Sequence, residues 1–150
     1  MVRLATLEEL DAIIDLAQRV FTRPWPTALW HAEIEAGEVF VIGAPILGFA
    51  CARIVRDRCE LRRLVVDASA RRTGQGRALL ARVIDSARAA GCARIQLEVG
   101  TTNTAAVALY RSSGFEVAGY RRGYYDDPPD DALLMVHAIA EDPKSTSCSN

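Results

Sequence analysis

The chain has 150 residues, of which half are hydrophobic and a quarter are charged, and its formal net charge is −1. A chain of this length and composition predicts a compact globular domain that buries most of its apolar surface. The small net charge excludes binding to nucleic acid or an anionic membrane through overall charge. We expect one domain over residues 1–140 and a polar, disordered tail over residues 141–150.

The N-terminal residues and the cysteines are typical of a cytoplasmic protein. The first eleven residues lack the apolar segment of a signal peptide. The longest apolar run, Val39–Ala52, is broken by glycine and proline and is shorter than the about 20 residues of a membrane helix. The sequence has only two histidines and no CxxC pair, so we expect no zinc site and reduced thiols at Cys51, Cys59, Cys92 and Cys148.

The first half of the sequence predicts two helices and three longer strands. Thr6 and Glu9 have the spacing of a capping box, and apolar residues then recur at helical spacing as far as Phe21. The segment Arg23–Pro26 ends this helix, and Gly43–Pro45 forms a tight turn further on. In chain order we expect a short strand over Val2–Ala5, the first helix, a second helix over Thr27–Ala36, and strands over Val39–Ile42, Leu47–Val55 and Cys59–Val66.

The second half predicts two more helices and three more strands. The first of these helices spans Gly76–Ala90, with Gly91 as its C-terminal cap, and the alternating segment Arg94–Val99 is a half-buried strand. The remaining elements are a helix from the capping residue Asn103 to Ser113, and strands over Phe115–Tyr124 and Asp131–Ala138 joined by a turn at Asp126–Asp131. This order predicts an α/β protein whose mixed sheet carries helices on both faces.

Glycines and arginines gather where a strand passes into a helix. Gly74-Gln75-Gly76 lets the backbone turn tightly, and the helix N-terminus offers unpaired N–H groups to an anion such as pyrophosphate. Arg71, Arg72 and Arg77 would add charge. Leu79 replaces the third glycine of the dinucleotide fingerprint, and no Gly-Lys-Ser/Thr of a P-loop follows. A Gly-x-Gly by itself is more typical of a plain turn with solvated arginines.

Two segments of the sequence resemble one known family. The motif Arg71–Gly76 resembles the acetyl-CoA-binding signature of the GCN5-related N-acetyltransferases (GNAT), and Leu64–Asp67 has the form of that family's fourth strand. Leu97–Tyr125 is similar, almost position for position, to the RimI branch, whose members acetylate the N-terminal alanine of a small-subunit ribosomal protein. The resemblance covers most of Thr6–Ala138 and is weakest over Trp30–Arg58.

The resemblance implies both a fold and a reaction. The expected GNAT fold has a mixed, mostly antiparallel central sheet of six to seven strands flanked by about four helices. The expected reaction passes an acetyl group directly from acetyl-CoA to an amine, with no metal and no covalent acetyl-enzyme. The expected partner is a protein N-terminal peptide, with no direct contact to nucleic acid or membrane.

By position, the resemblance also assigns residues to the reaction. Glu98 matches the general base that acts on the incoming amine, and Tyr110 matches the general acid that protonates the departing CoA sulfur. The expected acetyl-CoA contacts are Tyr110, Asn103 and the backbone of Leu64 and Val66 for the pantetheine arm, and Arg71, Arg72, Thr73, Gly74, Gln75, Gly76 and Arg77 for the pyrophosphate. Without the resemblance, Glu98 is a residue on a solvated strand face, Tyr110 lies at the edge of the core, and Asn103 is a helix cap.

The expected base favours an α-amine as acceptor. An α-amino group has a pKa of about 7.7–8.0, whereas a lysine needs roughly 3 pH units, or ~4 kcal/mol, of additional help. Two alternatives remain open: the same chemistry on a small-molecule amine or a lysine, and a non-catalytic acyl-CoA-binding module. The presence of both Glu98 and Tyr110 argues against the second alternative.

Two local features bear on the acceptor. The acidic segment Asp126–Asp131 is typical of an exposed turn, and the alternative is an acidic rim that attracts a basic peptide, beside an apolar wall of Trp25 and Tyr124. Relatives in the RimI branch often carry arginine where this chain has Gly100, so any contact made by that arginine is missing here.

Overall fold

The structure is a computed structural model that describes residues 1–21, 24–126 and 129–139. The expected tail over residues 141–150, Cys148, Arg23 and Asp127 lie outside the described residues. The strands are β1 (Val2–Leu4), β2 (Val39–Ile42), β3 (Gly48–Val55), β4 (Arg58–Val66), β5 (Arg94–Gly100), β6 (Glu116–Asp126) and β7 (Pro129–Ala138). The helices are α1 (Leu10–Val20), α2 (Thr27–Ala36), α3 (Gln75–Ala89) and α4 (Thr104–Ser112), with 3₁₀ turns at Leu7–Glu9 and Ala68–Ala70.

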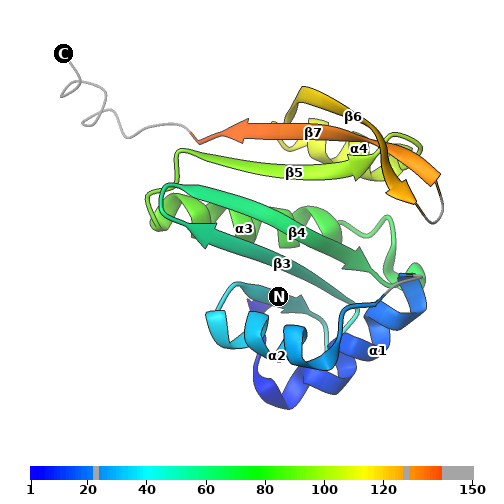
Figure 1. The fold of residues 1–150 in the computed structure, drawn as a ribbon. Helices are drawn as coiled ribbons and strands as arrows, with labels where there is room; N and C mark the ends of the chain where they lie inside the picture. The colour runs from blue at the N-terminus through cyan, green and yellow to red at the C-terminus, as the bar shows by residue number, and fades with distance from the viewer. Residues whose placement is uncertain (22–23, 127–128, 140–150) are drawn as a thin grey trace.

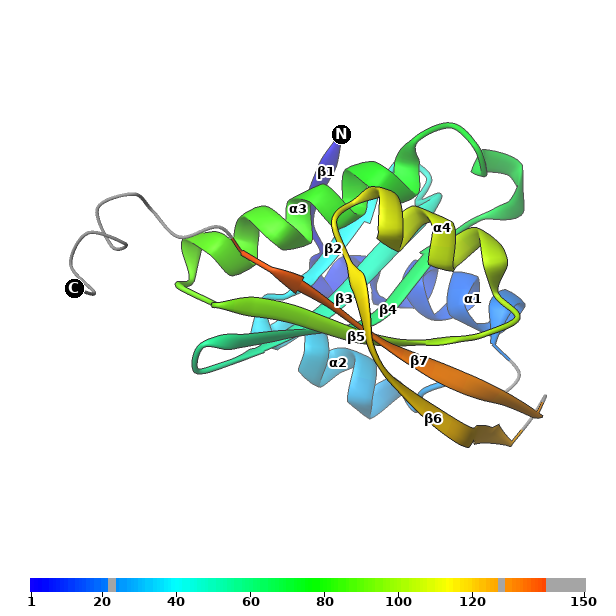
Figure 2. The same cartoon turned by 90° about the horizontal axis from the view of Figure 1, so that it is seen from above.

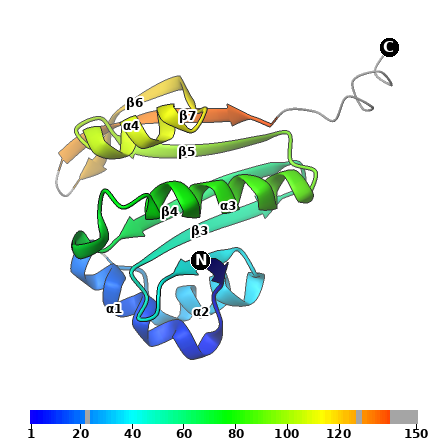
Figure 3. The ribbon, with the colours of Figure 1, turned by 180° about the vertical axis from the view of Figure 1, so that it is seen from behind.

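The seven described strands form one sheet in the order β1-β2-β3-β4-β5-β7-β6 (Figure 1). Every neighbouring pair is antiparallel except β4 and β5, which run parallel. Helices α3 and α4 cover one face of the sheet, and α1 and α2 cover the other (Figures 2 and 3). The predicted mixed, mostly antiparallel sheet with helices on both faces is confirmed.

Each face of the sheet has its own hydrophobic core. On the α3 face, Leu79, Leu80 and Val83 pack against alternate residues of the central strands. On the α1 and α2 face, Trp30 is fully buried and makes an edge contact with Phe49, with ring centroids 5.1 Å apart. Because β2 and the first half of β3 lie between both helix layers, the side chains of Val39–Ile42 and Gly48–Ala52 are buried on both faces, in agreement with the apolar segment Val39–Ala52 of the sequence.

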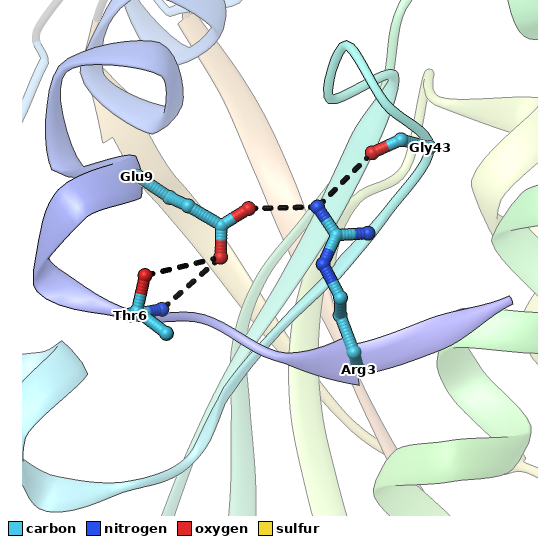
Figure 4. A network of polar contacts seen from close by, with 4 residues as sticks. All are labelled: Arg3, Thr6, Glu9 and Gly43. Carbon is cyan, nitrogen blue, oxygen red and sulfur yellow. Dashed lines mark hydrogen bonds and ion pairs between the residues drawn. The ribbon is translucent and has the colours of Figure 1, made fainter.

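The predicted capping box is present at the first helical turn (Figure 4). Glu9 Oε1 accepts hydrogen bonds from the Thr6 amide at 3.2 Å and from its hydroxyl at 3.5 Å. Glu9 Oε2 also accepts from Arg3 Nη2 at 2.7 Å, and Arg3 donates to the Gly43 carbonyl at 3.2 Å. The cap therefore ties β1, the first helical turn and the turn after β2 together, although this first turn is 3₁₀ rather than α.

The last hairpin is longer than its sequence predicted. The expected turn over Asp126–Asp131 has the right place but is too long, because Asp126 pairs with Pro129 and Tyr125 pairs with Asp130 within the ladder of β6 and β7. Asp131 is held inside the hairpin, where it accepts hydrogen bonds from the Gly123 amide at 2.6 Å and from the Tyr120 hydroxyl. Local hydrogen bonds thus accommodate acidic residues that normally favour a turn.

Candidate active site

The parallel strands β4 and β5 separate from one another along their length (Figure 1). A cleft lined by residues of both strands lies at this opening. Their pairing ends at Glu60 and Gln96, whereas β4 stays paired with β3 and β5 stays paired with β7 beyond that point. The cleft has a volume of about 710 Å³. Residues 61–66 and 97–100 therefore turn strand edges toward the cleft, where an extended ligand can pair with the backbone.

The cleft collects four of the predicted site residues. Leu64 from β4, Glu98 from β5, Asn103 ahead of α4 and Tyr110 from α4 all line it. Val66 and the segment Arg71–Arg77 do not line it, and the Val66 carbonyl accepts a hydrogen bond from Arg71 Nε at 3.4 Å. The predicted catalytic pair is thus in one cavity, and the glycine-rich loop lies outside its lining.

Tyr110 lies at the inner wall of the cleft and also belongs to the core. It is only 7% exposed, and its ring packs against Phe115 at a centroid distance of 5.8 Å. Burial raises the pKa of the Tyr110 hydroxyl to about 12. At neutral pH the group is therefore protonated and able to donate a proton. Tyr110 is therefore both a core residue and a residue of the cleft wall.

Glu98 presents a carboxylate with an unused acceptor. Its Oε1 lies 3.8 Å from Arg121 Nη2, and its Oε2 is buried without a hydrogen-bond partner among the described residues. Tyr124 lies nearby, and its pKa is raised, first by hydrogen bonding toward the Glu98 carboxylate and then by burial. A buried, unpaired carboxylate oxygen is costly unless a ligand satisfies it, so Glu98 suits a proton acceptor facing an amine.

Asn103 acts as the predicted helix cap. Its side-chain oxygen accepts a hydrogen bond from the Ala106 amide at 3.3 Å, at the first turn of α4. The cap fixes the start of α4 and so helps to set the position of Tyr110, two turns further along. Asn103 also lines the cleft, so both interpretations of this residue are compatible with the structure.

The glycine-rich loop has the features of an anion cradle. Gly74 caps α3 with a φ of 83°, which favours glycine, although a Cβ placed there would meet no atom within 4 Å. Among the described residues, the amides of Arg72 to Arg77 donate no hydrogen bond to a backbone carbonyl outside a regular element. Arg77 instead donates from its side chain to Ser112 Oγ at 3.0 Å. The loop therefore leaves backbone donors open at a helix N-terminus, as a pyrophosphate requires.

The acidic residues of the β6–β7 hairpin form hydrogen bonds with nearby residues. Asp130 accepts hydrogen bonds from Thr101 Oγ1 at 2.8 Å and from Thr102 Oγ1 at 2.7 Å, which lower the pKa of its carboxyl. A Cβ at Gly100 would lie 2.4 Å from Asp130 Oδ2. Asp126 and Asp130 do line the cleft, but Asp130 is used to hold the loop between β5 and α4.

A group of charged and aromatic residues on the other wall of the cleft was not predicted from the sequence. Phe21, Arg62 and Arg63 line this wall, together with Trp25, which was expected there. Behind it, the carboxylate of Glu33 is only 4% exposed and pairs with Arg62. The two adjacent arginines, which interrupt the alternation of polar and apolar residues in β4, were the available signal.

Comparison with known proteins now fixes the family. The sequence matches the acetyltransferase (GNAT) family over residues 10–115. The chain belongs to the GNAT family of acetyltransferases. It is 34% identical over 139 residues to the [ribosomal protein bS18]-alanine N-acetyltransferase of Escherichia coli strain K12, covering 88% of this chain and 93% of that protein.

One further relative and one crystal structure agree with this assignment. The N-alpha-acetyltransferase RimI of Mycobacterium tuberculosis is 37% identical over 120 residues, covering 75% of this chain and 74% of that protein. The crystal structure of the ribosomal-protein-S18-alanine N-acetyltransferase from Escherichia coli superposes with a TM-score of 0.84 at 33% identity, covering 95% of both chains. The predicted family and GNAT fold are confirmed.

Over residues 1–21, 24–126 and 129–139, no group of three histidine, cysteine or acidic side chains is placed to hold a metal ion. Within the same ranges, no helix is long and apolar enough to cross a membrane.

Proposed function

We propose that this GNAT enzyme acetylates the N-terminal α-amine of a protein, with acetyl-CoA as the donor. The favoured acceptor is a ribosomal protein that starts with alanine, the substrate type in the names of the relatives from Escherichia coli. Such an acceptor places the enzyme in the cytoplasm. The observation that carries the proposal is the cleft between β4 and β5, which holds both an unpaired carboxylate oxygen and a protonated phenol.

The chain offers groups that fit acetyl-CoA. The open edge of β4 at Leu64 and Val66 suits the amides of the pantetheine arm, and Asn103 lies beside the same cleft. The free amides of Arg72 to Arg77 suit the pyrophosphate, with Arg71 adding charge. When bound, acetyl-CoA supplies the acetyl group as a thioester.

Glu98 and Tyr110 divide the proton transfers between them. Glu98 accepts the proton that the acceptor nitrogen loses as its bond to the acetyl carbon forms, directly or through a water. Tyr110 donates its hydroxyl proton to the sulfur as the carbon–sulfur bond breaks, and its raised pKa keeps that proton available at neutral pH. Glu98 thus accepts one proton and Tyr110 donates another, and both side chains line the same cleft.

The acidity of the acceptor favours an α-amine over a lysine. An α-amino group with a pKa of about 7.7–8.0 is already partly neutral near pH 7, whereas a lysine at about 10.4 is almost wholly protonated. Glu98 lies beside Arg121 and is the carboxylate that we assign as the base. The α-amine needs little help to lose its proton, whereas the lysine needs roughly 3 further pH units of help.

An acceptor panel with acetyl-CoA tests the proposal. One peptide begins with a free alanine followed by basic residues, a second is the same peptide with a blocked α-amine and a free lysine, and a third acceptor is a small amine. We expect turnover on the first peptide. Turnover only on the other two acceptors would show an enzyme of another acceptor class, and tight CoA binding without turnover would show a non-catalytic module.

A further inference from the structure

Arg63 reaches the cleft because of a bulge in β4. The register with β3 passes from Cys51 opposite Arg63 to Ala52 opposite Leu61, which leaves Arg62 as an extra residue. A bulge re-aims the side chains that follow it. Arg63 consequently lies against the aromatic residues of the α1 and α2 side, with its guanidinium carbon 3.9 Å from the ring centroid of Phe21 and 4.2 Å from that of Trp25.

The two arginines of the bulge have different partners. Arg62 forms an ion pair with the buried carboxylate of Glu33, which Arg53 also approaches at 3.8 Å. Arg63 has no carboxylate within ion-pair distance among the described residues, and its Nη1 is buried there without a hydrogen-bond partner. Burial lowers the pKa of the Arg63 guanidinium, but arginine still remains charged in a protein.

Arg63 lies on the β4 side of the cleft. It lines the same cavity as Glu98, which comes from β5 on the other side of the opening. A buried charged donor without a partner costs free energy, and a ligand oxygen would recover that cost. The cleft therefore has a cationic donor on one side and a proton acceptor on the other.

We propose that Arg63 determines the acceptor class by donating a hydrogen bond from its guanidinium group to an oxygen carried on the carbon next to the amine-bearing carbon. A peptide provides this oxygen as the carbonyl of its first residue, and a free amino acid provides it as a carboxylate. A lysine side chain has only methylenes at that distance from its amine. The inference rests on the proposed function, because it explains how the same site would select an α-amine.

A purely structural role for Arg63 makes different predictions. If the stacking of Arg63 on Phe21 and Trp25 mainly kept the segment between α1 and α2 in place, loss of Arg63 would destabilise the fold. It would then lower the rate of acetylation equally for every acceptor. Replacement of an unpaired buried donor by an apolar side chain of similar length is expected to leave stability unchanged or raise it. The two roles are therefore separable by measuring stability and acceptor preference together.

The test compares Arg63→Met with the unmodified enzyme on matched acceptors. The main pair is an alanine-starting peptide and the same peptide with an (E)-alkene in place of its first peptide bond, which removes only the oxygen and the N–H. Alanine, alaninamide and isopropylamine form a second series that separates a carboxylate, a carbonyl and no oxygen. The variant Arg53→Met is the control, because it removes one positive charge from β3 outside the cleft.

We expect Arg63→Met to lower kcat/KM by about 10- to 100-fold for acceptors that carry the oxygen, the range for a hydrogen bond to a charged group. For the alkene peptide and isopropylamine, kcat/KM should change by less than about threefold, and the melting temperature should not fall. Arg53→Met should leave kcat/KM unchanged for all acceptors. Arg63→Lys should recover only part of the loss, because lysine keeps the charge without the planar fork.

Equal slowing of all acceptors by Arg63→Met, or a lower melting temperature with unchanged preference, would overturn the role of Arg63. If the unmodified enzyme acetylates only the small amines, the proposed protein acceptor fails, and the second series alone decides the role of Arg63. If it acetylates none of the acceptors, both proposals fail.

Discussion

Glu60 of β4 and Gln96 of β5 are the last residue pair in the parallel ladder that joins the two halves of the sheet. Beyond this pair β4 stays paired with β3, and β5 stays paired with β7. The two strands can therefore separate while each remains hydrogen-bonded to a neighbour. The opening brings Leu64 to one wall and Glu98 to the other, and α4 places Tyr110 on the same cavity. The site is therefore a consequence of where two strands stop pairing.

Replacement of Tyr110 by phenylalanine should separate catalysis from binding. Tyr110→Phe removes the proton donor but keeps the ring that packs on Phe115, so kcat should fall by about 100-fold or more. The Kd for acetyl-CoA should stay within about twofold, because the donor hydroxyl is needed only as the sulfur departs. Tyr120→Phe, which alters an exposed tyrosine outside the cleft, is the matched control. Unchanged kcat in Tyr110→Phe would refute the assignment.

The alkaline pH dependence follows from the pKa of Tyr110. An exposed tyrosine titrates near 10, and burial raises the pKa of Tyr110 to about 12. The folded enzyme therefore keeps the donor proton as the pH rises from 8 to 10, and loses it only as the pH approaches 12. Single-turnover rates at saturating substrates should not fall between pH 8 and 10. A rate that is halved by pH 10 in the unmodified enzyme, with no such fall in Tyr110→Phe, would show an ordinary tyrosine pKa near 10.

The glycine-rich loop should bind acetyl-CoA mainly through its backbone. Gly74→Val introduces a β-branched residue at a φ of 83°, which shifts the amides that follow it, so the Kd for acetyl-CoA should rise by about tenfold or more. Arg72→Ala removes only an exposed charge and should raise the Kd by less than about threefold. Isothermal titration with acetyl-CoA compares the two variants, and a larger effect from Arg72→Ala would mean that charge rather than backbone dominates.

The loop between β5 and α4 should tolerate arginine at position 100 only when Asp130 is removed. Gly100→Arg forces Asp130 away from the Thr101 and Thr102 hydroxyls, so the melting temperature should fall by at least about 3 °C. In an Asp130→Ala background the same substitution should cost much less, since the obstructing oxygen is gone. Thermal unfolding of the two single variants and the double variant forms the cycle. Additive losses would show that the two positions do not interact.

Local signals in the sequence predicted local structure well. The Thr6 and Glu9 pair, Asn103 and Gly74 each act within a few residues, and each caps the helix that the sequence indicated. The resemblance of Leu97–Tyr125 to the RimI branch placed Glu98 and Tyr110, whose positions in one cleft depend on contacts between β5 and α4 that periodicity does not encode.

The bulge in β4 and the length of the last hairpin depend on contacts between separate strands and segments of the chain. The bulge at Arg62 appears only in the register of β4 against β3, so alternation alone could not predict that Arg63 faces Phe21. The length of the β6 and β7 hairpin depends on Asp131 bonding back to Gly123 across the strands. In both cases a polar side chain takes its position from a partner outside its own strand, and the pattern of that strand does not specify the partner.

Location of the acetyl group on a single bifunctional peptide tests the central claim most directly. The peptide starts with a free alanine, carries an internal lysine, and is incubated with the enzyme and acetyl-CoA before fragmentation by mass spectrometry. We expect the acetyl group on the α-amine of the alanine, and none on an otherwise identical peptide whose α-amine is blocked. Acetylation of the lysine in both peptides, with the alanine unmodified, would contradict the account.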